Sequence, residues 1–322
     1  MRYILLGFFL RFLVAIWNGF FGPSIGADGD ALVFHDVALY VSNTGVFEAK
    51  YNIGWVYSIF LGSVYYLTFN SIFIGSLLSC FAWLASAVLL NKSIQLLGIH
   101  QTYRNRALLF YALIPSSILF TSITLREVYQ LLFVNTLIYS SLMILIKKNS
   151  KFWFLLAFSA LFLGLLHFGL VLYALLVAVL TFYFTSIRQE RILSLELIIF
   201  YIPALVILSY GALSIFTAIV PFDFTDGLAA AVESYQMGHN ESRAMYVYKP
   251  EINGLFDLLL FMPISLLQYL LEPMPWRIST VLDLALFIEN IFRCFFIFYA
   301  VRALFTVKKY LRTPLVFLIL TF

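Results

Sequence analysis

Charged residues are scarce in this chain of 322 residues, because Asp, Glu, Lys and Arg make up only 11% of it. A typical soluble domain contains about 25%. Apolar residues make up 63%, and the mean hydropathy is +0.97. A soluble fold of this size cannot hide so much apolar surface from water, so the composition excludes a soluble enzyme, a disordered protein and a nucleic-acid-binding protein. It predicts an all-α, polytopic transmembrane bundle, in which the 35 Phe and 20 Tyr residues suit lipid-facing and interfacial positions.

Cysteine is also scarce. The chain has two cysteines, Cys80 and Cys294, and both lie inside apolar runs. These positions imply no disulfide framework. The net charge of +4 is typical of basic cytoplasmic loops and does not by itself indicate a basic ligand site.

In contrast to charged residues and cysteine, long apolar runs are abundant in the chain. A membrane-spanning helix needs about 20 mostly apolar residues, and the first candidate is Tyr3–Phe21. A cleaved signal peptide is the alternative, but Arg11 interrupts the apolar core, so we expect an uncleaved anchor. The later runs are Ile53–Phe69, Ser71–Leu90, Ala107–Leu125, Val128–Ile146, Phe152–Leu166, Phe168–Phe184, Ile192–Val220, Leu255–Leu271, Leu282–Phe305 and a final short run, 314–322.

Basic residues indicate which span ends face the cytoplasm, because positively charged loops stay inside. The clusters are Arg2, 92–106, 147–151, 188–191 and 308–312. All of them are cytoplasmic only if two of the apolar runs, Ile53–Phe69 and Leu255–Leu271, do not cross the membrane fully. The sequence therefore predicts about eight crossings and an acid-rich outer surface.

The predicted organisation is a single transmembrane domain over residues 1–322. Its outer loops are 22–52 and 221–254, and the interfacial or re-entrant segments that follow them are 53–69 and 255–271. We expect an integral, multi-pass protein of the bacterial cytoplasmic membrane with its N-terminus inside. The last run is about half a span, so the chain is either truncated there or ends on a short buried tail.

The densest group of ionisable residues is Asp28, Asp30, His35 and Asp36, at the predicted outer end of the first span. One interpretation is that Asp28 or Asp30 caps a helix over Ala31–Val41. Another is that one carboxylate is a general base at the membrane boundary, with His35 and Asp36 binding substrate. Carboxylates also suit a divalent metal, but the spacing matches no standard loop, so we predict no metal or other cofactor.

Arg126 and Glu127 form a second candidate, between two apolar runs at their predicted outer ends. Arg126 either reaches lipid headgroups or binds a phosphate of a lipid-linked substrate with Glu127 beside it. Arg11 lies deep in the first span and needs a partner from another helix or from an outer cavity, so it is a third candidate for substrate binding. His167 is expected in a tight outer turn, with substrate contact as the alternative.

The layout resembles the glycosyltransferase C superfamily, polytopic enzymes that use polyprenyl-phosphate sugars. The resemblance lies in Asp28-Gly29-Asp30, in Phe34-His35, in the segment from Tyr51 to Phe69, and in Leu113-Ile114-Pro115-Ser116-Ser117 leading to Leu125-Arg126-Glu127. It covers residues 1–150 by motif and most of the chain by topology. One departure is that Gly29 separates two aspartates that are often adjacent in the family.

The resemblance implies an outer-face transferase that moves a sugar from a polyprenyl-phosphate-linked donor to a glycan or lipid acceptor, in polysaccharide or envelope biosynthesis. Asp30, or else Asp28, would be the general base, and Arg126 would bind the lipid phosphate. The expected partners are the bilayer, the lipid-linked sugar and the acceptor, without nucleic acid. Two alternatives remain: a polysaccharide polymerase or ligase, and a lipid-linked glycan transporter or flippase without catalysis.

Overall fold

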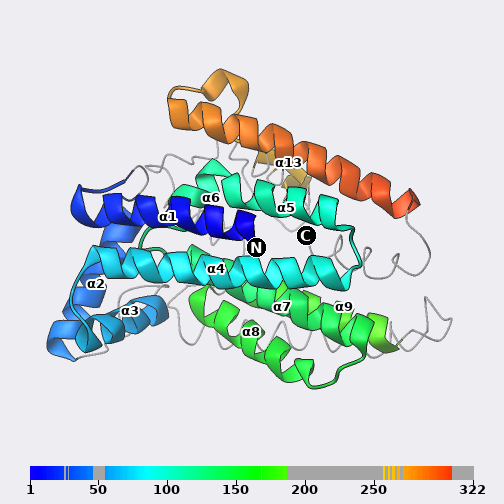
Figure 1. The fold of residues 1–322 in the computed structure, drawn as a ribbon, viewed down its shortest axis with the longest axis horizontal. Helices are drawn as coiled ribbons and strands as arrows, with labels where there is room; N and C mark the ends of the chain where they lie inside the picture. The colour runs from blue at the N-terminus through cyan, green and yellow to red at the C-terminus, as the bar shows by residue number, and fades with distance from the viewer. Residues whose placement is uncertain are drawn as a thin grey trace. The chain divides into compact units, whose positions relative to one another are not determined.

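The computed structural model describes residues 1–24, 27, 29–45, 55–167, 169–186 and 271–306, with residues 257, 260–261, 263–264 and 267–268. Every secondary-structure element within these residues is a helix (Figure 1). The all-α prediction is therefore confirmed for the described part of the chain. The elements are α1 (Arg2–Phe20), α2 (Asp30–Thr44), α3 (Trp55–Leu67), α4 (Ile72–Leu96), α5 (Gln101–Leu113), α6 (Pro115–Phe120), α7 (Glu127–Lys147), α8 (Phe152–Leu166), α9 (Gly169–Ser186), the 3-10 helix η2 (Pro275–Arg277) and α13 (Val281–Thr306).

The chain divides into two compact units. The first unit is Met1–Ala212 with Val307–Phe322, and the second unit is Leu213–Thr306. Helices α1 to α9 belong to the first unit, whereas η2 and α13 belong to the second. The single transmembrane domain over 1–322 stays a prediction.

Three of the described helices are long and apolar enough to cross a membrane: α1, α4 and α7. The 19 residues of α1 extend about 28 Å at 1.5 Å per residue, close to the hydrocarbon thickness of about 30 Å. The apolar helices α3 and α8 are shorter, and the 13 residues of α3 extend about 20 Å. The sequence prediction of a membrane protein with transmembrane helices is thus supported at this level.

Side-chain contacts fix the directions of α1, α4 and α7. Helix α1 runs antiparallel to α4, because the end of α1 meets the start of α4 and earlier residues of α1 meet later residues of α4. Helix α7 runs parallel to α4, since their contacts advance together along both chains. The paired residues are Asn18 with Ser76, Phe8 with Phe81, Gly75 with Thr124 just before α7, and Ser86 with Asn135.

The remaining long helices of the first unit continue this alternation. Helix α8 runs antiparallel to α7, and α9 returns parallel to α7. The segment of α5 and α6 runs parallel to α1. The paired residues are Tyr139 with Phe152, Phe133 with Phe162, Ser141 with Thr181, Gly7 with Ala112, and Arg11 with Thr121.

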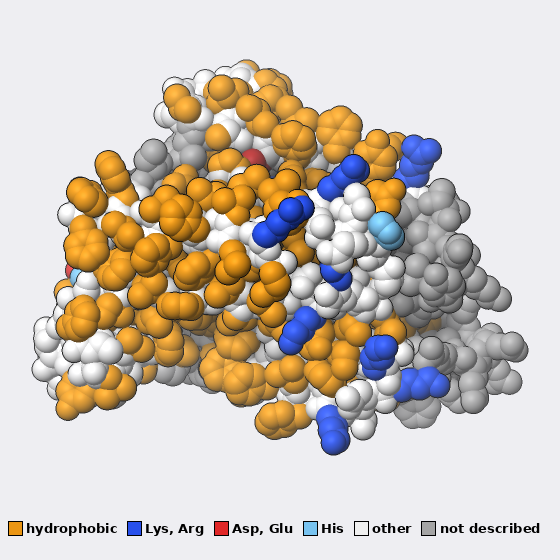
Figure 2. Space-filling model, in the orientation of Figure 1, with side chains coloured by type: hydrophobic (Ala, Val, Ile, Leu, Met, Phe, Trp, Pro, Cys, Tyr) orange, Lys and Arg blue, Asp and Glu red, His pale blue; other side chains and the backbone are white. Residues whose placement is uncertain are grey.

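These directions separate two ends of the first unit. The basic end holds the connections from α4 to α5 and from α7 to α8. In these connections and in the helix turns beside them lie Lys92, Arg104, Arg106, Lys147, Lys148 and Lys151. The opposite end, called here the acidic end, holds the start of α2, the start of α7 and the turn from α8 to α9. Within this unit, Figure 2 shows blue Lys and Arg side chains toward the right, where α8 begins, and orange apolar side chains over the middle and left.

A helix break lies within the run that the sequence predicted as one span, Ala107–Leu125. Helix α5 ends at Leu113, and α6 begins with Pro115 at its first position. Proline has no N–H and biases the preceding residue, Ile114, away from helical backbone angles, so the break follows from the sequence locally. After α6 the chain stays non-helical through 121–126, and Ser122 and Ile123 are completely buried there.

Helices α2 and α3 pack together at the acidic end. Gly62 of α3 permits this contact, because a Cβ atom there would lie 2.6 Å from Val41 Cγ1 and 2.9 Å from the Ala38 carbonyl oxygen of α2. Such small residues let membrane helices approach closely. The predicted helix over Ala31–Val41 is longer than expected and spans Asp30–Thr44.

Candidate functional site

A buried apolar cluster brings several elements together at the acidic end. It joins α2, α3, the non-helical segment before α7, and the end of α8. Its members are Ala27, Ala31, Phe34, Ala38, Tyr57, Leu61, Tyr65, Ile123, Leu125 and Leu166. The residues around this cluster include most of the described candidates from the sequence.

Asp30 begins α2 and is exposed. The N-cap is Gly29, whose φ of 78° suits glycine and which has no side chain of its own to cap the helix. For Asp30 the capping interpretation is therefore wrong, and its carboxylate lies in the first turn, where the helix dipole favours negative charge. Asp28 lies outside the described residues.

Arg126 precedes α7 and connects three elements. Its Nε lies 3.6 Å from Glu127 Oε1, its Nη1 lies 3.4 Å from the Leu166 carbonyl oxygen, and its Cζ lies 5.7 Å from the ring centroid of Phe34. The side chain of Arg126 is 16% exposed and that of Glu127 is 45% exposed. Nε is buried and has no hydrogen-bond acceptor among the described residues, so the hydrogen-bonding capacity of this guanidinium is not fully used within the protein.

The charges at this end influence one another. Glu127 interacts electrostatically with Arg126 and with Asp30 of α2. Partial burial lowers the pKa of His167, at the turn between α8 and α9, and the positive charge of Arg126 lowers it further. The structure thus places Asp30 and His167, from other parts of the sequence, within electrostatic range of the adjacent residues Arg126 and Glu127.

His35 lies on α2 and is half-buried. Its Nδ1 lies within hydrogen-bonding distance of the Tyr65 hydroxyl of α3, at 2.9 Å. Burial lowers the pKa of His35, and the neighbouring charge of Asp36 opposes this effect. Asp36 itself is exposed on α2.

Arg11 lies elsewhere in the first unit. It is completely buried among the packed helices. Its Nε donates to Thr121 Oγ1 at 2.7 Å, its Nη2 donates to Ser117 Oγ at 2.9 Å, and its Nη1 donates to the carbonyl oxygens of Gly7 and Ala112, both at 3.0 Å.

The carbonyl oxygen of Ala112 lies beside the break between α5 and α6. Carbonyl groups freed by a helix break in a membrane must find a donor elsewhere, and Arg11 supplies one. Its Cζ also lies 3.6 Å from the ring centroid of Trp83. This geometry favours a structural role for Arg11 over the substrate-binding role that the sequence suggested.

Tyr65 and Phe34 are site residues that the sequence did not single out. A signal for Tyr65 existed, because Tyr57, Leu61 and Tyr65 recur every four residues and therefore share one face of α3. No local signal could have paired Phe34 with Arg126, since that contact depends on how α2 packs near the start of α7.

Among the described residues, no three of His, Cys, Asp and Glu lie close enough together to hold a metal ion. The second predicted outer loop, 221–254, lies outside the described residues.

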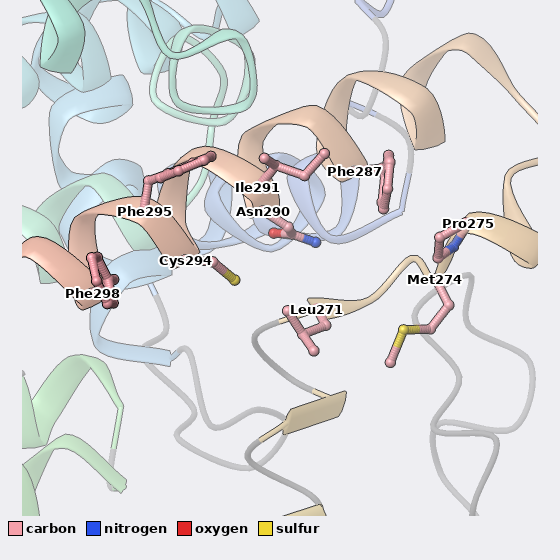
Figure 3. Close-up of a pocket in the computed structure, with 9 residues that line it drawn as sticks. All are labelled: Leu271, Met274, Pro275, Phe287, Asn290, Ile291, Cys294, Phe295 and Phe298. Carbon is pink, nitrogen blue, oxygen red and sulfur yellow. The ribbon is translucent and has the colours of Figure 1, made fainter.

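The second unit has a separate apolar pocket of about 590 Å³ (Figure 3). Its lining comes from α13 and from the segment that contains η2, with Leu271, Phe287 and Phe295 among the apolar side chains. The polar side chain in this lining, Asn290, donates a hydrogen bond to the Glu272 carbonyl oxygen at 2.6 Å.

No family model, no curated protein and no solved structure matches the chain.

Proposed function

We propose that the chain is an integral membrane glycosyltransferase. It would transfer a sugar from a polyprenyl-phosphate-linked donor to a glycan or lipid acceptor on the extracytoplasmic face. The observation that carries the proposal is that Asp30 lies within electrostatic range of Glu127, next to Arg126, at the acidic end of the first unit.

The sidedness of the site supports this assignment. Basic loops stay in the cytoplasm, so the basic end is the inner end and the acidic end faces outward. The alternating directions of α1, α4, α5–α6, α7, α8 and α9 fit successive crossings with the N-terminus inside. Helix α3, about 20 Å long, fits an interfacial segment better than a full crossing.

The site has the two chemical functions that such a transfer needs. The Asp30 carboxylate takes the proton of the acceptor hydroxyl while the acceptor oxygen bonds to the anomeric carbon. The bond between that carbon and the phosphate oxygen breaks, and the phosphate leaves with the electron pair. Arg126 stabilises the departing phosphate by charge-assisted hydrogen bonds. Asp28 is the second candidate for the base.

The test is sugar transfer in membranes that contain the full chain at equal expression. The variants are Asp30→Asn, Asp28→Asn, Asp36→Asn and Arg126→Lys, with Tyr40→Phe as a control on an exposed residue of α2. Removal of the general base should reduce the rate by a factor of about 10² or more. Loss of the planar guanidinium in Arg126→Lys should raise KM for the lipid-linked donor.

Wild-type activity in all three aspartate variants would show that this mechanism is wrong. If the aspartates were dispensable and Arg126 essential, a polysaccharide polymerase or ligase would fit better. If purified protein moved a lipid-linked glycan across liposomes without altering it, the chain would be a transporter.

A further inference from the structure

The hydrogen bond between His35 and Tyr65 links two residues 30 positions apart in the sequence. The Nδ1 and hydroxyl oxygen atoms lie 2.9 Å apart. The two rings meet edge to face, with centroids 5.5 Å apart and an interplanar angle of 72°. This pair joins α2 to α3 beside the site described above.

Tyr65 is held firmly by its surroundings. Its side chain is 2% exposed, inside the apolar cluster that supports the site. A Cβ atom on Gly75 would lie only 3.1 Å from its hydroxyl, so the phenol packs directly against the backbone of α4. The close contact at Gly62 fixes α3 on α2. The hydroxyl of Tyr65 therefore occupies a defined position relative to His35.

The direction of this hydrogen bond follows from the partners available. Among the residues that the structure describes, His35 Nδ1 is the one hydrogen-bond partner of the Tyr65 hydroxyl. A buried hydroxyl proton without an acceptor is unfavourable, so the O–H group donates to Nδ1. An imidazole that accepts at Nδ1 in its neutral form carries its proton at Nε2.

The protonation state agrees with this assignment. Burial lowers the pKa of His35, and the charge of Asp36 on the same helix only partly opposes that effect. The ring is therefore mainly neutral at neutral pH. Its Nε2 is not the nitrogen that contacts Tyr65, and His35 is only half-buried, so part of this side chain is open to its surroundings.

We infer that Tyr65 is a positioning residue, which holds His35 as a neutral Nε2–H donor for an oxygen atom of the bound substrate. In this role His35 binds substrate and does not act as a base. The substrate part of the inference rests on the proposed function, whereas the tautomer of His35 does not depend on it.

The first test is ¹⁵N NMR of histidine-labelled full-length protein in nanodiscs, with the His35 signals assigned from their loss in His35→Gln. We expect the Nε2-protonated tautomer in the wild type. Tyr65→Phe should give a mixture of tautomers, because it removes the donor to Nδ1. The matched control is Tyr66→Phe, since Tyr66 is adjacent and 75% exposed. An Nδ1-protonated wild type, or an unchanged tautomer in Tyr65→Phe, would overturn the inference.

The second test measures substrate binding. Addition of a short-chain polyprenyl phosphate should shift the His35 Nε2 signal in the wild type. In the transfer assay, Tyr65→Phe should raise KM about tenfold with little change in kcat, as expected for one weakened hydrogen bond.

His35→Gln keeps an amide N–H near the position of Nε2, so it should retain more binding than His35→Ala. Equal loss in both variants would contradict a donor role for His35. If the tautomer results hold but the wild type transfers no sugar, the proposed function fails while the positioning of His35 by Tyr65 stands.

Discussion

Replacement of Arg11 by alanine should destabilise the protein strongly. The arginine is completely buried and donates four hydrogen bonds, three of them to residues of α5, α6 and the segment after α6. Alanine would leave the Ala112 carbonyl oxygen beside the helix break without this donor.

The expected decrease in the free energy of unfolding follows from these contacts. Hydrogen bonds between helices of a membrane protein average about 0.6 kcal/mol each, so the three long-range bonds contribute about 2 kcal/mol. The contact with the Trp83 ring, with Cζ 3.6 Å from its centroid, contributes about 2 kcal/mol when desolvated. We therefore expect Arg11→Ala to lower the free energy of unfolding by about 4 kcal/mol.

The assay is reversible unfolding in mixed micelles, followed by circular dichroism. Arg2→Ala is the control, because Arg2 is exposed on the same helix. Arg11→Lys should fall between wild type and Arg11→Ala, since an ammonium group cannot reproduce the planar arrangement of guanidinium donors. A loss below about 1 kcal/mol for Arg11→Ala would refute this account of Arg11.

Two other predictions concern packing and sidedness. Gly62→Ala should force α2 away from α3, because the new Cβ atom would lie 2.6 Å from an atom of Val41, and we expect a destabilisation of about 1–3 kcal/mol in the same unfolding assay. In a background without Cys80 and Cys294, a single cysteine at Asp36 should react with a membrane-impermeant reagent from outside, whereas one at Lys148 should react only after the membrane is opened.

A specific experimental outcome would contradict each of these two predictions. A Gly62→Ala variant as stable as Tyr66→Phe would mean that α2 and α3 do not approach as closely as the structure places them. Labelling of both cysteine positions from the same side would contradict the separation of acidic and basic ends across the membrane.

Much of the helical framework follows from the sequence. The predicted run Phe152–Leu166 coincides with α8, and Val128–Ile146 differs from α7 by one residue at each end. Hydropathy locates such helices because lipid requires a continuous apolar segment with its backbone hydrogen bonds satisfied internally. The hydropathy pattern did not predict the break at Pro115, since the run continues apolar on both sides of it.

The candidate site was predicted in part. The sequence indicated Asp30, His35, Arg126 and Glu127 because charges are rare in this chain and these residues lie at the ends of apolar runs. It also indicated Arg11, for the same reason, and it could not separate a buried structural arginine from one that faces a ligand. That distinction depends on Thr121, Ser117 and Ala112, which lie more than 100 residues away.

The sequence by itself determined the class of the protein, because the scarcity of charge and the length of the apolar runs are properties of short segments. Only the tertiary structure decided which residues meet. Tyr65 reaches His35, and Arg126 lies over Phe34, because α2, α3, α7 and α8 converge on one buried cluster. Such contacts depend on how helix surfaces fit together, and no periodicity within a single segment encodes that fit.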